Sequence, residues 1–93
     1  MSTIDQIVVK IIKEQELIIG PLAWSQAAKV HGLHIIDQKS GAVSIDGNAP
    51  TVINSLVSQY EHLFGRASKE VCKDAAASLL VSLSSSEVPS SLR

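Results

Sequence analysis

The hydrophobic period changes twice along the chain, and this change most restricts the fold. Apolar residues recur every three or four positions near the N-terminus, alternate in the middle, and return to the helical period from residue 52 onward. A period of 3.6 residues predicts amphipathic helices, and a period of two predicts half-buried strands. The predicted fold is therefore a mostly helical α+β domain with the order α-α-β-β-α-α.

The first and third helices have the most regular apolar faces. The first is predicted to run to about Leu17, with a buried face formed by Ile4, Ile7, Val8, Ile11 and Ile12. The third follows Pro50, with an apolar face formed by Val52, Ile53, Leu56, Val57, Tyr60, Leu63 and Phe64. Glycine adopts the backbone conformations that end helices, so Gly65 is expected to end the third helix.

The second and fourth helices are less regular. The second is predicted over residues 22–30, with Pro21 at its first position, Gly32 as its cap, and a buried side formed by Leu22, Ala27 and Val30. The fourth is predicted to be capped by Ser68 and to carry on one side Val71, Cys72, Ala75, Ala76, Leu79, Leu80 and Leu83. Because the connection at residues 65–67 is short, the third and fourth helices should be antiparallel neighbours.

Residues 33–45 carry the alternating pattern. Leu33 and Ile35 alternate in one predicted strand, and Val43 and Ile45 in the next. Gly41 supplies the positive φ that the loop of a β-hairpin often needs. Two strands alone are marginally stable in water, so we expect the hairpin to pack on the helical core or to pair with the hairpin of a second copy.

Length and composition limit the organisation of the chain. Its 93 residues suffice for one domain, which we expect at residues 1–83, followed by a disordered serine-rich tail at 84–93. One cysteine excludes an intramolecular disulfide and fits a reducing cytoplasm. No apolar run approaches the roughly 18 residues of a membrane span, so we expect a soluble cytoplasmic protein without membrane contact.

The segment QAAKVHGLHI, residues 26–35, raises the hypothesis of a helix-turn-helix. Ala28 and Gly32 stand four apart, like the small residue and the turn glycine of that motif. A basic recognition helix should follow, yet the next residues alternate like strands and carry Asp37 and Asp46 against a single lysine, Lys39. The net charge of −1 also lacks a basic excess. A DNA-binding regulator using residues 22–40 is therefore the alternative hypothesis, and nucleic acid is not the expected partner.

Histidines and the cysteine suggest chemistry only weakly. His31, His34 and Asp37 are three potential metal ligands, but Gly32 interrupts the helix that would make them converge, so we expect neither a metal nor another cofactor. Cys72 lies in the first turn of the fourth helix, where the helix dipole lowers a thiol pKa. Its register places it on the apolar face, and the sequence designates no base to activate it. We therefore expect a core cysteine, no catalytic residue and no enzymatic activity.

Apolar residues beyond those that one core requires favour protein–protein interaction. The interface candidates are Ile18, Ile19, Trp24 and Val81. Exposed tryptophan is enriched at binding hot spots, although a tryptophan at the rim of the core is the other interpretation of Trp24. A weak anion or partner patch is predicted at Arg66, Lys69 and Lys73, which are spaced three and four apart. The predicted function is that of a small adaptor, regulator or accessory subunit that forms a homodimer and binds another protein.

Overall fold

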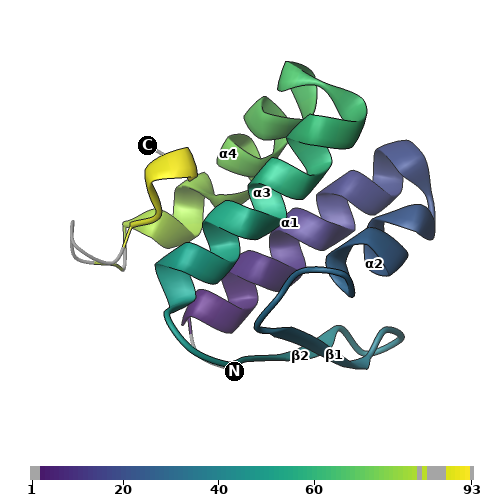
Figure 1. Ribbon diagram of the computed structural model, residues 1–93. Coiled ribbons are helices and arrows are strands. Elements are labelled where there is room, and N and C mark those ends of the chain that lie inside the picture. The colour runs from purple at the N-terminus through teal and green to yellow at the C-terminus, as the bar shows by residue number, and fades with distance from the viewer. Residues whose placement is uncertain (1–2, 82, 84–87, 93) are drawn as a thin grey trace.

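The computed structural model describes residues 3–81, 83 and 88–92. Within these residues the elements are α1 (Thr3–Ile19), α2 (Leu22–Ala27), β1 (Leu33–Asp37), β2 (Ala42–Ile45), α3 (Ala49–Phe64), α4 (Arg66–Leu80) and a short 3₁₀ helix, η1 (Ser90–Leu92) (Figure 1). The predicted α+β class and the predicted order of helices and strands are confirmed. None of the helices in the described part of the chain is long and apolar enough to cross a membrane.

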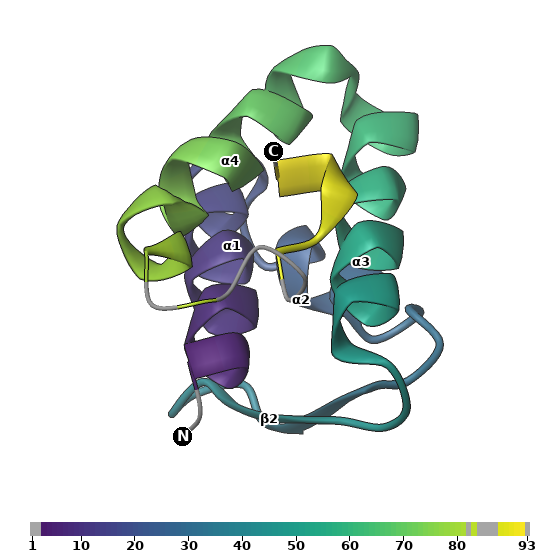
Figure 2. The ribbon, with the colours of Figure 1, turned by 90° about the vertical axis from the view of Figure 1, so that its left-hand side faces the viewer.

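The first helix, α1, is the centre of the fold. It packs against α2, α4 and β2, and Figure 2 shows it beside α4, with α3 across the core and the hairpin below. The predicted apolar face is confirmed, and burial extends to Val9 and Gln15. Val9 is covered because the hairpin approaches α1 at Gly41, where an added Cβ would lie 3.1 Å from Val9 Cγ1.

The β-hairpin packs on the helices. Its two strands are antiparallel, with Leu33 opposite Ile45 and a bulge at Ile36. Leu33 and Val43 are buried in the common core, whereas the side chain of Ile36 is 67% exposed. The hairpin packs against α1, which is one of the two arrangements expected for it.

The second helix is shorter than predicted, and Gly32 has a different role. The helix ends at Ala27, and Leu22 is exposed instead of buried. Gly32 has φ +88°, and a Cβ there would lie 2.7 Å from the carbonyl oxygen of Asp46 and 2.9 Å from Val52 Cγ2. Glycine is therefore required because the backbone that follows β2 and the start of α3 approach this position closely.

A single residue, Gly65, separates α3 from α4. The third helix begins as predicted, with Asn48 Oδ1 accepting a 3.0 Å hydrogen bond from Thr51 N. The fourth begins at Arg66, so the prediction that Ser68 caps it is wrong: Ser68 lies inside the helix and is buried. The two helices are neighbours, and Figure 2 shows α4 turning back from the end of α3 so that the pair forms an arch.

The C-terminal residues differ from the expected disordered tail. Residues 88–92 lie against the domain, with η1 in contact with α3 and α4. Pro89 and Leu92 are buried, and Ser91 N donates a 3.0 Å hydrogen bond to Asn54 Oδ1. The serine-rich composition predicted disorder, but Pro89 and Leu92 are two apolar residues within it. They lie in the space between α3 and α4. Residues 84–87 and 93 of the expected tail lie outside the described residues.

Candidate interaction site

An open groove of about 650 Å³ runs between α1 and α4 on the outside of the domain. Four residues of α1 line it at helical spacing: Lys10, Glu14, Leu17 and Ile18. The opposite wall is formed by α4, chiefly through Val71, Asp74, Ala75 and Ser78. We call this feature the α1–α4 groove.

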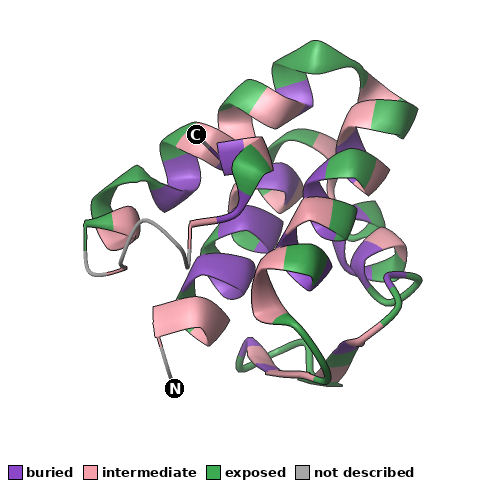
Figure 3. Ribbon diagram, turned by 60° about the vertical axis from the view of Figure 1, so that its left-hand side comes forward, coloured by how far each residue is buried: buried purple, intermediate pink, exposed green. Residues whose placement is uncertain are grey.

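The groove has exposed apolar residues near both of its ends. Leu17 is 80% exposed and Ile18 is 62% exposed at one end. The two helices are antiparallel, since Gln15 near the end of α1 reaches Ser68 near the start of α4. The other end of α4 therefore lies near the start of α1, and there Val81, just after the helix, is 85% exposed. Figure 3 shows exposed residues along the outer side of α4, with buried ones facing the core.

Charges of both signs occupy the middle of the groove. Lys10 Nζ lies 3.7 Å from Glu14 Oε1, one helical turn further along α1. Asp74 adds a second carboxylate from α4. Lys13 lies next to this region, in the adjacent depression that also includes Lys10 and Leu79. The groove thus contains one lysine and two carboxylates, with a second lysine beside it.

Of the four predicted interface residues, two are exposed and two are buried or partly buried. Ile18 and Val81 are exposed, as an interface requires, whereas Ile19 is partly buried against the core. Trp24 is only 3% exposed, and its Nε1 donates a 2.9 Å hydrogen bond to Glu16 Oε2. The folded chain thus covers the ring, in agreement with the interpretation of Trp24 as a tryptophan at the rim of the core, and its role as an interface anchor stays a prediction.

Leu17 was missed in the sequence, where it served only to mark the end of the first helix. It lines the groove from α1 together with Lys10 and Glu14. An apolar residue among charged residues on the outer side of a helix is the signal that could have identified it.

The predicted basic patch lies on another surface. Arg66 is exposed, and Lys69 and Lys73 are partly exposed on the first two turns of α4. The helical period places Lys69 and Lys73 on the side of α4 opposite Val71 and Ser78. The basic patch is therefore separate from the α1–α4 groove.

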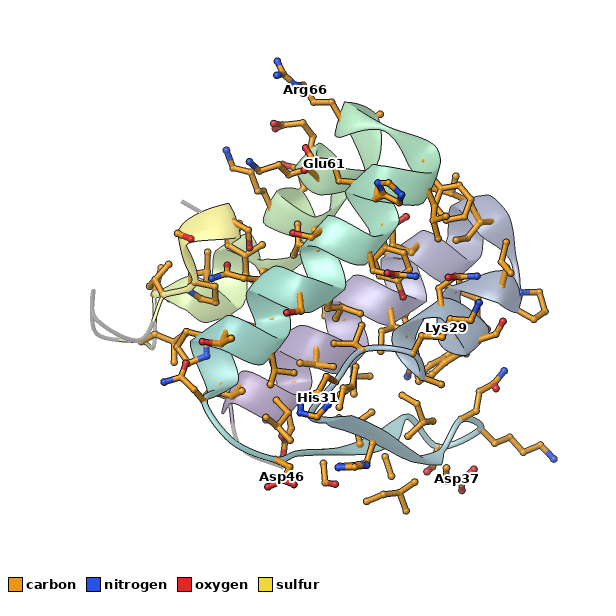
Figure 4. All side chains as sticks on the ribbon, in the orientation of Figure 1. Lys29, His31, Asp37, Asp46, Glu61 and Arg66 are labelled. Atoms are coloured by element: carbon orange, nitrogen blue, oxygen red, sulfur yellow. The ribbon has the colours of Figure 1, made fainter. Side chains whose placement is uncertain are left out.

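His31 and His34 lie near Asp46, and not near Asp37 as the metal-site hypothesis required. His31 and His34 line a depression of about 250 Å³ with Asp46, at the open end of the hairpin. Figure 4 shows His31 near Asp46, while Asp37 lies at the turn end of the hairpin. In the part of the chain that the structure describes, no three His, Cys, Asp or Glu side chains are placed to hold a metal ion.

Cys72 belongs to a buried polar cluster between α1 and α4. It is fully buried, and burial raises the pKa of its thiol to about 11 although a hydrogen bond from Gln15 opposes this rise. Gln15 Nε2 donates to the Ser68 carbonyl at 2.9 Å and to Cys72 Sγ at 3.4 Å. A thiol with this pKa is protonated at neutral pH, so the arrangement suits a core residue and does not activate a nucleophile.

The helix-turn-helix interpretation of residues 22–40 loses its structural basis. Strand β1 begins at Leu33, directly after Gly32, and β2 follows it in the hairpin. Residues 35–42, where a recognition helix would be needed, are strand and turn. No element in this segment can enter the major groove as the second helix of that motif does.

Comparison with known proteins identifies no relative of this chain. No family model matches it, and no curated sequence and no solved structure is significantly similar to it. What the residues define is a small, mostly helical α+β domain. Its most distinctive surface is a groove with apolar ends and a centre of mixed charge.

Proposed function

We propose that this domain is a protein–protein interaction module that self-associates through the α1–α4 groove. The observation that carries the proposal is the exposure of Leu17 and Ile18, which line one end of the groove, and of Val81, which follows α4 beyond the last groove residue of that helix. Large aliphatic side chains gain free energy when they leave water, at about 25 cal/mol per Å² of buried apolar surface. Exposed large apolar side chains that lie together, as Leu17 and Ile18 do, mark sites of association.

The antiparallel arrangement of α1 and α4 favours a second copy of the chain as the partner. A two-fold axis through the middle of the groove would exchange its two ends. It would lay Leu17 and Ile18 of one copy over the end that holds Leu79 and Val81 in the other. An isologous contact of this kind requires a surface complementary to itself, and apolar groups at both ends supply that property.

The charged residues in and beside the groove also favour a second copy of the chain as the partner. Lys10 and Glu14 line the groove from α1, Asp74 lines it from α4, and Lys13 lies in the adjacent depression. Because the surface carries both signs, two grooves facing each other can match lysines with carboxylates. A surface of one sign would repel its copy. The basic patch at Arg66, Lys69 and Lys73 remains accessible in such a dimer.

The test is the mass of two variants in solution. Leu17→Glu introduces a charge into the proposed contact and should weaken dimerisation by roughly tenfold or more. Ile36→Glu is the matched control, because Ile36 is comparably exposed but lies on the hairpin. Sedimentation equilibrium should show dissociation of Leu17→Glu alone, with unchanged circular dichroism in both variants. Equal masses for wild type, Leu17→Glu and Ile36→Glu would contradict the proposal.

A further inference from the structure

The junction between α3 and α4 has an unusual conformation. Gly65 is its only residue, with φ +89° and ψ −178°. This region of backbone space is accessible essentially to glycine alone. A Cβ added at Gly65 would meet nothing within 4 Å, so the conformation of the backbone, and not packing, requires glycine here.

The apolar pattern continues through this junction at helical spacing. Tyr60, Phe64, Ser68 and Cys72 are each four residues apart, and all four are buried or partly buried. Ala75 and Leu79 extend the same series on α4. If Gly65 took helical angles, residues 49–80 would form one continuous amphipathic helix.

The buried residues of α4 have small side chains, while Leu79 and Leu80 pack partly buried against the core. The buried residues of α4 are Ser68, Cys72, Ala75 and Ala76. Gln15 of α1 is fully buried at its contact with α4, and its Oε1 has no hydrogen-bond partner among the described residues. Small side chains bury little apolar area, and a buried unpaired carbonyl is unfavourable, so both features weaken the contact that α4 makes with α1.

We propose that Gly65 is a hinge through which α4, together with η1, exchanges between two copies of the chain. In the exchanged dimer α3 and α4 form one helix, and the contacts of α4 with α1 and α3 are made with the partner copy instead. Domain exchange of this kind keeps the native contacts and changes only the hinge. The exchange does not depend on the α1–α4 groove as a docking surface, so it stands or falls independently of the proposed function.

The hinge is tested by Gly65→Ala. Alanine disfavours the conformation found at Gly65 and favours a helix, so the substitution should shift the protein to a dimer with twice the 9.9 kDa mass of the chain. Gly47→Ala is the matched control, since Gly47 has φ +91°, also has open space around its Cβ position, and does not join two helices. With Leu17→Glu present in both variants, so that association through the groove does not contribute, exchange predicts a dimer for Gly65→Ala only. Equal masses for the two folded variants would overturn the proposal.

A distance measurement identifies the exchanged form directly. Spin labels at Thr51→Cys and Ser78→Cys would be separated by about 40 Å in one continuous helix, at 1.5 Å per residue. In the closed fold, whose longest dimension is 32 Å, the start of α3 and the end of α4 lie on the same side of the arch (Figure 2). Labelled Gly65→Ala chains diluted into unlabelled ones should show the long distance. A short distance in a dimer would overturn the exchange.

Two further measurements separate this proposal from association through the groove. Leu17→Glu added to Gly65→Ala should leave the exchanged dimer intact, because the exchange re-forms core contacts. Loss of that dimer would assign it to the groove and overturn the exchange. If Gly65→Ala does not fold, the labelled wild-type chain refolded at high concentration provides the test. It should contain a dimer with the long distance that dissociates slowly on dilution, and refolding to monomers alone would overturn the proposal.

Discussion

Tyr60 on α3 donates a 2.7 Å hydrogen bond from its hydroxyl to the backbone carbonyl of Ala23 on α2. Both residues are fully buried. This bond connects the third helix to the short second helix across the core, and it satisfies the one polar atom of the largest fully buried side chain. It therefore fixes how the first half of the chain meets the second.

Replacing Tyr60 with phenylalanine should destabilise the protein by about 1 kcal/mol, because a buried hydrogen bond is lost while the ring remains. Guanidinium unfolding would measure the change. Ser25→Ala is the control, since Ser25 Oγ makes a 3.2 Å hydrogen bond at an exposed position. Equal unfolding free energies for Tyr60→Phe and wild type would show that the bond contributes nothing.

Stability should fall at alkaline pH. Burial raises the pKa of the Cys72 thiol from 9.0 to about 11. Because the pKa is higher in the folded state, this contribution is complete below pH 9 and is lost as the pH rises from 9 to 11. Burial, and the nearby Cys72 to a smaller extent, also raise the pKa of Tyr60, which extends the loss to higher pH.

Unfolding free energies at pH 8 and pH 10.5 would measure this effect. Cys72→Ala removes one of the two ionising groups, so its stability should fall less steeply than that of wild type over the same interval. The same slope for both proteins would contradict the assigned pKa. Folded wild type should also react slowly with a thiol reagent at pH 8, since Cys72 is fully buried and protonated.

Gln15→Met should stabilise the domain by about 1 kcal/mol. Methionine has a similar shape and removes the unpaired Oε1, whose burial costs more than the amide hydrogen bonds contribute. Ser68 lies within α4, so its carbonyl still accepts the helical hydrogen bond. The control is Gln59→Met, since the Gln59 amide donates a 2.8 Å hydrogen bond to Gln26 Oε1 and should give no gain. Thermal unfolding would compare the stability of the two variants with that of wild type. A Gln15→Met variant less stable than wild type would contradict the inference that the buried Oε1 of Gln15 is unfavourable.

Gly32→Ala should destabilise the domain more than Gly47→Ala, by about 1–3 kcal/mol. Both glycines have φ near +90°, so both substitutions place alanine at a φ that disfavours a side chain. Only at Gly32 would the new methyl group meet the Asp46 carbonyl and Val52. Chemical unfolding of the two variants measures the contact alone. Equal losses would mean that the chain relaxes around the methyl group.

The hydrophobic periods were sufficient to predict the elements and their order. Burial on α1 followed its 3.6-residue repeat, and the two strands followed the alternation of Leu33, Ile35, Val43 and Ile45. These patterns report which face of an element is apolar. They succeed because each amphipathic element in a small domain has only one core to cover.

The sequence could not show which neighbour covers a given apolar side chain. Trp24 and Leu17 are both apolar and near the end of a helix, yet Glu16 and the core enclose Trp24 while Leu17 is exposed. Leu92 is a similar case, because its burial depends on the space between α3 and α4. The position of the α1–α4 groove depends on which helices pack side by side. The hydrophobic pattern of the sequence shows the apolar face of each helix, but not its neighbours.

Self-association of the wild-type chain is the central claim, and its mass as a function of concentration tests it most directly. Sedimentation equilibrium should show a mass that rises from 9.9 kDa toward twice that value as the protein concentration increases. A mass that stays at 9.9 kDa up to about 1 mM, where even weak dimers form, would contradict association through the α1–α4 groove.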